Sequence, residues 1–244
     1  MLSRLRTAAL WGLEAFPVEC EVDVGPGLPG FTLVGLPDPS VREVRDRVWP
    51  ALRNSGLEPP TRRVTVNLAP AGRRKEGASV DLAVALGLLA ATEQVPLARL
   101  DGTAAIGEVA LDGALRPVRG TLALAEAAWR AGALRLLCAA EGAPEAALVE
   151  GLVVLPVRTI GEAVEWLRGG ERPRQIPAAP DLDGNTVEDL TDVRGQALAR
   201  RALEIAAAGG HHLLMVGSPG AGKSMLARRL PGSCPRWRPR RPWW

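Results

Sequence analysis

Apolar and polar positions alternate in two stretches near the start of the chain. Residues 5–11 show this pattern, and so do residues 18–24, where valine and cysteine alternate with acidic side chains. Alternation is typical of a strand with one buried face, so both stretches are predicted strands. The apolar run at 31–34 and the β-branched stretch at 63–68 predict two more strands.

Two helices are predicted among these strands. The first covers residues 40–54, with Asp38 or Ser40 as its N-cap. The second covers residues 78–91, ASVDLAVALGLLAA, which would be apolar on every side of a helix. Such a stretch is typical of a helix buried in a core, because a surface helix needs a polar face.

Strands and helices continue to alternate up to residue 168. Asp112-Gly113 lies between apolar segments at 105–111 and 114–118, which predicts a hairpin. The fold class expected for this alternation is α/β or α+β with a mixed sheet. The remaining predicted elements are helices at 121–131, 144–150 and 160–168 and strands at 134–138 and 152–157.

A stretch rich in glycine and proline, residues 169–180, predicts a domain boundary. We therefore expect an N-terminal domain over residues 1–168, a linker over 169–186 and a second unit over 187–232. In the second unit the pattern predicts a helix at 194–208, a buried strand at 212–216 and a further helix after Ser224.

The loop after the predicted strand carries the sharpest motif of the chain. Gly217-Ser218-Pro219-Gly220-Ala221-Gly222-Lys223-Ser224 fits G-x-x-x-x-G-K-[ST] at every fixed position. Glycines let backbone N–H groups close around phosphates, and a following helix adds the positive end of its dipole. The motif predicts an ATP site, with Lys223 on the β- and γ-phosphates and Ser224 as a Mg²⁺ ligand. The alternative is a glycine-rich connection that binds no ligand.

Hydrolysis of ATP requires more than this loop. A carboxylate on a later strand usually completes the Mg²⁺ shell and positions water, yet residues 225–244 contain no Asp or Glu. We therefore expect the chain to bind ATP and Mg²⁺ without turnover, and we assign no catalytic residue.

Composition and charge narrow the class of protein. Hydrophobic residues make up 47% of the 244, which excludes wholesale disorder. No stretch approaches the roughly 18 apolar residues of a membrane span, and Glu14 interrupts any secretory signal. Three scattered cysteines predict neither a disulfide framework nor a zinc site. A cytoplasmic location without a membrane partner is expected.

The basic residues are distributed unevenly. Net charge is +3, and the last fourteen residues hold four Arg and no acid, so the rest of the chain is near neutral. A diffuse nucleic-acid-binding face is therefore not predicted. Of the 30 basic residues, only Lys75 and Lys223 are lysines. A position that keeps lysine in so arginine-rich a chain is a candidate for needing a compact ammonium group.

Several long segments together resemble one family. GLPGFTLVGLPDPSVRE, VTVNLAPAGRRKEGASVDLAVALGLLAA and GEVALDGALRPVRG are followed by DLTDVRGQALARRALEIAAAGGHHLLMVGSPGAGKSMLARRLPG. In this order they resemble the magnesium-chelatase-like AAA+ ATPases of the ComM (YifB) type. The resemblance implies a Lon-protease-like (ribosomal S5 domain 2-like) N-terminal domain followed by the start of a P-loop AAA+ module.

The resemblance also implies a function and partners. Full-length members are hexameric ATPases that act on branched DNA during natural transformation, so ATP and DNA are the implied partners. After Gly232 the sequence departs from the family pattern, and residues 233–244 form an Arg/Trp/Pro-rich tail. We expect an out-of-frame or truncated product that lacks the Walker B acids, sensors and arginine finger and does not hexamerise. The other interpretation of the tail is a single-strand-binding segment.

Lon-type proteases suggest a second site. Residues 75–81 resemble the stretch around their nucleophile and put Ser79 in its place, but Leu122 stands where the activating lysine should be. Without an adjacent base a serine is not a nucleophile, so no protease activity is expected. Ser79 is instead interpreted as a helix N-cap.

Other polar residues have two interpretations each. Asp192 and Gln196 resemble a family segment that lies near the adenine, or they cap the following helix. His211 and His212 are adjacent, so on a strand they would face opposite ways and share no metal. We expect them to close the loop before the strand.

Two hypotheses of function follow from these observations. The first is an ATP-binding member of the ComM-type family that does not hydrolyse ATP. The alternative is a non-enzymatic module that binds a partner or DNA and carries a vestigial nucleotide loop.

Overall fold

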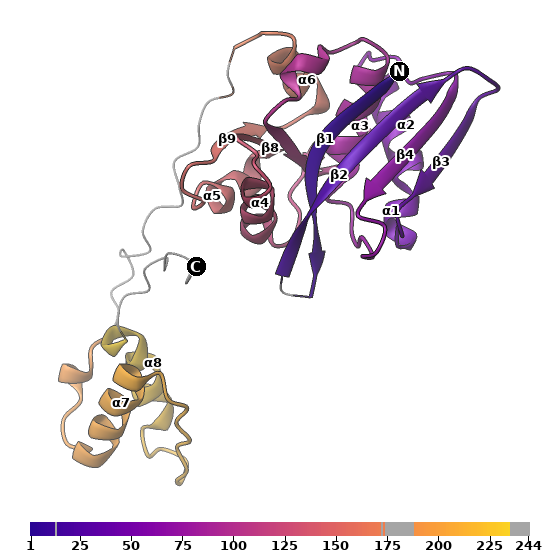
Figure 1. The fold of residues 1–244 in the computed structure, drawn as a ribbon. Coiled ribbons are helices and arrows are strands. Elements are labelled where there is room, and N and C mark those ends of the chain that lie inside the picture. The colour runs from indigo at the N-terminus through magenta and orange to yellow at the C-terminus, as the bar shows by residue number, and fades with distance from the viewer. Residues whose placement is uncertain (13, 172, 174–187, 235–244) are drawn as a thin grey trace. The chain divides into compact units, whose positions relative to one another are not determined.

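The computed structural model describes residues 1–12, 14–171, 173 and 188–234 and separates the chain into two compact units, 1–180 and 181–244 (Figure 1). Most of the expected linker, and the tail from residue 235 onward, lie outside the described residues. Each unit is described by itself below.

The first unit is built on one mixed sheet. Strand β1 pairs antiparallel with β2, and β2 pairs antiparallel with β4. The other pairings, β3 with β4, β1 with β5, β5 with β8 and β8 with β9, are parallel. In spatial order the strands are β3 (Gly30–Val34), β4 (Arg63–Ala69), β2 (Glu14–Gly25), β1 (Leu2–Trp11), β5 (Thr103–Ile106), β8 (Arg135–Ala139) and β9 (Val153–Val157). The mixed α/β class expected from the sequence is confirmed.

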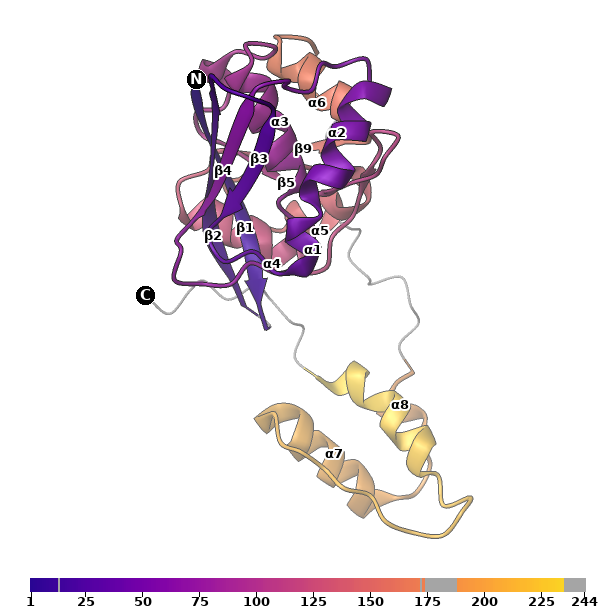
Figure 2. The ribbon, with the colours of Figure 1, turned by 90° about the vertical axis from the view of Figure 1, so that its right-hand side faces the viewer.

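Helices cover both faces of this sheet (Figures 1 and 2). One apolar cluster joins the sheet to α3, α2 and α6, and a second joins β5 and β8 to α4 and α5. The helices are α1 (Pro39–Arg42), α2 (Val44–Asn54), α3 (Asp81–Ala91), α4 (Thr121–Arg130), α5 (Ala143–Ala146) and α6 (Ile160–Leu167), with 3-10 turns at Leu97–Arg99 and Ala140–Gly142.

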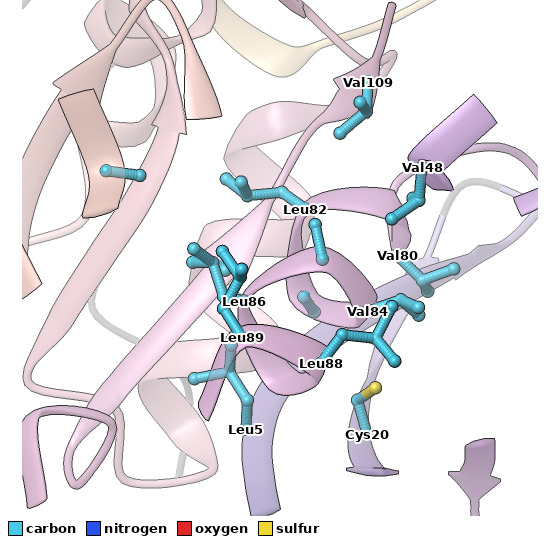
Figure 3. Close-up of a cluster of buried hydrophobic side chains, with 14 of the residues drawn as sticks. Leu5, Cys20, Val48, Val80, Leu82, Val84, Leu86, Leu88, Leu89 and Val109 are labelled. Atoms are coloured by element: carbon cyan, nitrogen blue, oxygen red, sulfur yellow. The ribbon is translucent and has the colours of Figure 1, made fainter. Parts of the chain in front are cut away.

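Helix α3 is the centre of the core. All of its residues are buried, as its lack of a polar face predicts. Figure 3 shows its leucines gathered with Leu5 of β1 and Cys20 of β2. Ser3 of β1 donates a hydrogen bond to the carbonyl of Gly87 at 2.7 Å, and a side chain at Gly87 would lie 2.8 Å from Val22. Glycine therefore lets α3 lie directly on the sheet.

Two elements differ from their predicted bounds. The helix expected at 40–54 is interrupted at Glu43, which separates α1 from α2. Asp38 caps α1 by accepting from the N–H of Val41 at 2.7 Å. Ser40, the other candidate cap, donates to that same carboxylate. Asp38 is the cap because it directly precedes α1, whereas Ser40 already lies within the helix.

The strand expected at 105–111 is divided at Gly107. Its first part is β5, which enters the main sheet, and its second part is β6 (Glu108–Val109). Strand β6 pairs antiparallel with β7 (Leu115–Arg116) in a separate two-stranded sheet. The hairpin around Asp112-Gly113 is confirmed, and it is shorter than predicted.

The second unit is small. It holds a 3-10 turn at Leu190–Asp192, α7 (Ala197–Gly209) and α8 (Lys223–Ser233). Its apolar core consists of Leu190, Val193, Leu203 and Leu226. Neither these helices nor any other in the described part of the chain is long and apolar enough to cross a membrane.

The buried strand predicted at 212–216 is wrong. These residues form a loop, and Leu214 and Val216 are 86% and 87% exposed. Only Met215 packs against the small core. A strand is stabilised by a neighbouring strand and by burial of its face, and the described residues of this unit supply no second strand. The apolar pattern of 212–216 is therefore not sufficient to form one.

Candidate phosphate-binding loop

The motif at 217–224 forms a turn that leads directly into a helix. Lys223 is the first residue of α8, and Gly222 stands at the N-cap position. Gly220 and Gly222 have φ angles of 82° and 81°. Only glycine adopts this backbone region at low cost. The backbone conformation of the loop therefore explains why glycine occupies these two positions of the motif.

Backbone donors gather at the start of α8. The N–H of Ala221 donates within the loop to the carbonyl of Ser218 at 3.3 Å, and the first helical bond is from Leu226 to Gly222 at 3.0 Å. No side chain caps the helix. The N–H groups of its first turn have no intrahelical partner, and together with the helix dipole they make a site that suits an anion.

The ammonium group of Lys223 is bonded to its own loop. Its Nζ donates to the carbonyls of Gly217 and Ser218, each at 2.8 Å. A phosphate group would have to replace these two carbonyls as the partner of Lys223. The exchange is favourable because a hydrogen bond between two ionised groups is stronger than one from an ammonium to a neutral carbonyl.

Ser224 occupies the position expected for a Mg²⁺ ligand. It lies in the first turn of α8 and is exposed. A hydroxyl oxygen is the kind of hard ligand that Mg²⁺ takes together with phosphate oxygens and waters. The described residues contain no cluster of His, Cys, Asp and Glu able to hold a metal by themselves. Ser224 thus suits Mg²⁺ that arrives with a phosphate ligand.

A residue ahead of α7 reaches the loop. The side-chain amide of Gln196 donates to the carbonyl of Ala221 at 3.2 Å, and Gln196 adopts a left-handed backbone with φ of 54°. Its side chain does not cap α7, although it occupies the N-cap position. Asp192 does not occupy the N-cap position either, because it ends the preceding 3-10 turn, which Asp189 caps through Thr191. The helix-capping interpretation is therefore wrong for both residues.

An ion pair that the sequence did not indicate braces α8. Arg229 lies 2.9 Å from Glu188, and the side chain of Arg229 is only 16% exposed. Glu188 precedes the 3-10 turn that contributes Leu190 to the core. The pair joins two segments about forty residues apart, which periodicity within one helix could not indicate.

The two histidines lie in the loop after α7 and are exposed. The N–H of His211 donates to the carbonyl of Ala206 at 2.9 Å and so ends the helix. This bond places His211 at the start of the loop, as expected, but the strand that the loop was expected to precede does not form.

Ser79 is not a helix cap. Its hydroxyl donates to the carbonyl of Ala8 at 3.0 Å, and the N-cap position of α3 is Val80, with no side-chain bond. The N-cap interpretation was wrong because a carbonyl of β1, distant in sequence, satisfies this hydroxyl. Ser79 is 5% exposed, so it is a structural link between β1 and α3.

Lys75 is a buried structural cation. Its side chain is fully buried, and its Nζ donates to the carbonyls of Gly35, at 2.7 Å, and Pro70. Burial lowers the pKa of Lys75. These two carbonyls follow strands β3 and β4, so the ammonium joins the two strand ends. A planar guanidinium is larger than the ammonium that fits here, which explains why lysine is kept.

The described residues thus combine a mixed α/β unit with a second unit in which a phosphate-loop motif leads into a helix. These two parts define the class of the molecule, a two-unit α/β protein with a P-loop motif. Two family models match it: "Subunit ChlI of Mg-chelatase" over residues 20–142 and "Magnesium chelatase, subunit ChlI" over residues 189–241. The second match runs past Gly232, where the resemblance was expected to end.

Relatives of known name cover nearly the whole chain. It is 43% identical to YifB of Escherichia coli (strain K12) over 237 residues, which is 96% of this chain and 46% of that protein. It is 42% identical to competence protein ComM of Haemophilus influenzae (strain ATCC 51907 / DSM 11121 / KW20 / Rd) over 242 residues, 96% of this chain and 47% of that one. The chain belongs to the magnesium-chelatase-like family of the ComM (YifB) type, and it spans about half the length of these relatives.

A weaker match reaches the Lon proteases. Lon protease 2 of Bacillus subtilis (strain 168) is 28% identical over 145 residues, which is 58% of this chain and 25% of that protein. Ser79, which the sequence motif suggested as the counterpart of the Lon nucleophile, is buried and bonded to a backbone carbonyl.

Proposed function

We propose that the chain binds Mg²⁺-ATP through residues 217–224. The observation that carries this proposal is the geometry of the loop. Gly222 occupies the N-cap position of α8, no side chain caps that helix, and Lys223 and Ser224 lie in its first turn. Backbone N–H groups, an ammonium and a hydroxyl are thereby presented to one place. Polyphosphate is the ligand whose charge and oxygen atoms match this set.

Each residue of the loop would have a distinct part in binding. The N–H groups from Gly220 to Met225 would hold the β-phosphate, and Lys223 would leave its two carbonyls to bind the outer phosphates. Ser224 would supply one oxygen to Mg²⁺, which neutralises the charge that gathers on the phosphates. Gln196, held against Ala221, would fix the far side of the loop and lie near the base.

We further propose that the first unit is a Lon-like domain without peptidase activity. The match to a Lon protease supports this assignment, and so does the family model over residues 20–142. In this proposal the unit has the Lon-like fold but no peptidase activity. The hydroxyl of Ser79 is hydrogen-bonded to the carbonyl of Ala8, and Leu122 offers no base to activate it.

The role of the protein in the cell is proposed from its family. The resemblance to ComM-type ATPases supports work on DNA, and a relative is named a competence protein. A cytoplasmic location belongs to the same proposal, whereas the hexamers of the full-length members are not proposed for this chain. Cys20, Cys138 and Cys234 are free, as a reducing compartment favours.

Nucleotide titration of the chain and two variants tests the binding proposal. Lys223→Ala should weaken Mg²⁺-ATP binding by at least about tenfold, because a hydrogen bond between ionised groups contributes about 1.5–3 kcal/mol. Arg228→Ala is the matched control, since Arg228 is an exposed basic residue on the same helix. Calorimetry with ATP and Mg²⁺ measures both. Equal affinities in the two variants would contradict the assignment of Lys223.

The alternative is a vestigial loop in a module that binds a partner or DNA. One observation favours it: the ammonium of Lys223 already has two carbonyl partners, so the loop is satisfied without a ligand. If the chain shows no ATP binding at millimolar concentration yet binds branched DNA, this alternative replaces the first proposal.

A further inference from the structure

Three arginines and a tryptophan lie along one side of helices α1 and α2. Arg45, Trp49 and Arg53 follow one another at intervals of four residues in α2, so their side chains leave the helix on the same side. Arg42 continues this line one turn earlier, because Glu43, between the two helices, also has a right-handed helical backbone with φ of −75°. Arg42, Arg45, Trp49 and Arg53 are called the α2 stripe below.

The α2 stripe faces away from the core. The opposite side of α2 packs against the core through its buried residues, Val44, Val48, Ala51 and Leu52. Figure 2 shows α1 and α2 one after the other along one side of the first unit. The three arginines of the stripe are exposed. At a rise of 1.5 Å per residue, Arg45 and Arg53 are about 12 Å apart along the helix, so an extended ligand can contact both.

The positive charge of the α2 stripe is not neutralised by ion pairs. In the described part of the chain, none of its three arginines has a carboxylate oxygen within 4.0 Å. Glu43 is engaged by Arg47 at 3.3 Å, on another side of the helix. Asp46 is the one carboxylate within α1 and α2, so the stripe keeps a net positive charge. Its guanidinium groups are therefore free to bind an anionic ligand.

Trp49 is held in place within this row of charges. Its ring meets Phe31 of β3 edge to face, with the ring centroids 5.3 Å apart, and the guanidinium carbon of Arg45 lies 6.0 Å from the ring centroid. Trp49 is only partly buried, so part of the indole remains accessible. Because the ring is already fixed, stacking a flat group on it costs little conformational entropy.

A single-stranded nucleic acid matches the α2 stripe better than other polyanions do. Guanidinium groups bind phosphate oxygens, and an aromatic ring among them stacks on an unpaired base. The bases of a duplex are already stacked on one another, so a duplex leaves Trp49 without a partner. An acidic protein segment supplies carboxylates but no bases. Net charge over the whole chain did not indicate this surface, because helical period gathers the three arginines locally.

We propose that the α2 stripe binds single-stranded DNA, with its three arginines on phosphates and Trp49 stacked on one base. This inference rests on the proposed work on DNA and assigns a DNA contact to the first unit, whereas the phosphate loop belongs to the second. Since the contacts to phosphates release counterions, the affinity depends steeply on salt concentration.

Binding of a labelled thymidine oligonucleotide to the full chain tests the arginines. Fluorescence anisotropy at several salt concentrations gives the affinity and its salt dependence. The combined variant Arg42→Gln, Arg45→Gln and Arg53→Gln removes three phosphate contacts. The slope of log K against log salt should fall in magnitude by about 2, because each contact to a single strand contributes about 0.7. Binding at about 0.1 M salt should weaken by about tenfold or more.

A matched control separates position from net charge. The combined variant Arg6→Gln, Arg99→Gln and Arg119→Gln also loses three positive charges, and these arginines are exposed on the first unit outside α1 and α2. It should keep the wild-type slope. Because all six arginines are exposed, both variants should fold, and equal thermal unfolding temperatures check this.

Photo-crosslinking tests the stacked base. An oligonucleotide that contains 5-iododeoxyuridine links to an aromatic side chain stacked on that base, so peptide mapping of the wild-type adduct should find Trp49. Competition then tests the class of ligand. Unlabelled single strand should displace the probe better than a duplex of the same length and better than poly-glutamate with the same number of charges.

Several results would overturn the proposal. If the two arginine variants bind alike, or if the crosslink maps elsewhere, for example to residues 235–244, the assigned surface is wrong and the proposed work on DNA stands. If poly-glutamate or the duplex competes as well as the single strand, the ligand is an acidic protein segment or duplex DNA instead. If the wild-type chain binds no DNA, the proposed work on DNA fails for this chain as well.

Discussion

At the scale of single residues, an ion pair with a buried carboxylate links α2 to α3. Asp81 is fully buried, and Arg47 holds it with two hydrogen bonds, from Nε at 2.6 Å and from Nη2 at 2.9 Å. Arg47 also donates to the carbonyl of Ser40 at 2.9 Å. Burial raises the pKa of Asp81 to about 6, while the bonds from Arg47 oppose that rise. Glu108, close by, raises it slightly further.

Removing the arginine should therefore destabilise the first unit. Arg47→Met leaves the Asp81 carboxylate buried without its partner, so we expect a loss of about 3 kcal/mol or more in the free energy of unfolding at neutral pH. Asp81→Asn combined with Arg47→Met should recover part of this loss, because no buried charge remains. Chemical denaturation of the three proteins measures the difference, and an Arg47→Met variant as stable as the wild type would contradict the role of the pair.

The pH dependence of the same pair has a definite sign. A carboxyl whose folded pKa exceeds its unfolded value binds protons more tightly in the folded state, so its contribution to stability declines as pH rises from about 4 to about 6. In Arg47→Met the pKa of Asp81 should rise further, and the decline should continue above pH 6. Thermal unfolding from pH 4 to pH 8 tests this. A variant whose profile is parallel to that of the wild type would contradict it.

At the scale of elements, the contact between β3 and β4 depends on one glycine. Gly35 follows β3 with φ of 102°, and a Cβ there would lie 2.2 Å from the carbonyl oxygen of Leu68. Lys75 reinforces the same place by bonding the carbonyl of Gly35. The end of β3 is thus fixed by a close backbone approach and by a buried ammonium.

Gly35→Ala should destabilise the first unit strongly. A backbone clash and an unfavourable φ add together, for a cost on the order of 3 kcal/mol or more. Gly132→Ala is the matched control: Gly132 also has a positive φ, of 85°, but nothing lies within 4 Å of its added Cβ, so the cost should be about 1 kcal/mol. Thermal denaturation compares the two, and equal costs would show that the close approach is unimportant.

At the scale of the whole molecule, the two units differ in the size of their cores. Both large apolar clusters lie within the first unit, whereas the apolar cluster in the described part of the second unit has four buried residues. Burial of apolar surface is the main favourable term in folding. The first unit should therefore be stable by itself, and the second unit should contribute little to the cooperativity of thermal unfolding.

A fragment of residues 1–168 tests this division. It should unfold in one cooperative thermal transition at nearly the temperature of the 244-residue chain, because it retains both large clusters. Calorimetry of the fragment and the chain measures both transitions. A fragment without a cooperative transition would contradict the domain boundary proposed between residues 169 and 186.

Turnover of ATP is a second property of the whole molecule. Residues 225–244 supply no carboxylate after Ser224, so the 244-residue chain should bind Mg²⁺-ATP without releasing phosphate above the rate of Lys223→Ala. A phosphate-release assay on both proteins makes the comparison. Clear turnover by the wild type that the variant loses would show that a carboxylate elsewhere completes the site.

The features that the sequence alone determined are local. Alternation predicted β1 and β2, the uniformly apolar stretch predicted a buried α3, and Asp112-Gly113 predicted the hairpin. The motif at 217–224 indicated the loop and the helix after it. Each of these features depends on residues within a few positions of one another in the sequence, because side-chain period and turn chemistry are local properties.

Tertiary structure decided what depends on distant partners. Residues 212–216 have the pattern of a strand but no second strand beside them in the described unit, and Ser79 bonds a carbonyl 71 residues away instead of capping α3. Gln196 reaches the phosphate loop across 25 residues. The position of β3 at an edge of the sheet is known only from the order of the strands. Pattern predicts the state of a segment, whereas hydrogen-bond partners and exposure are set by which segments meet.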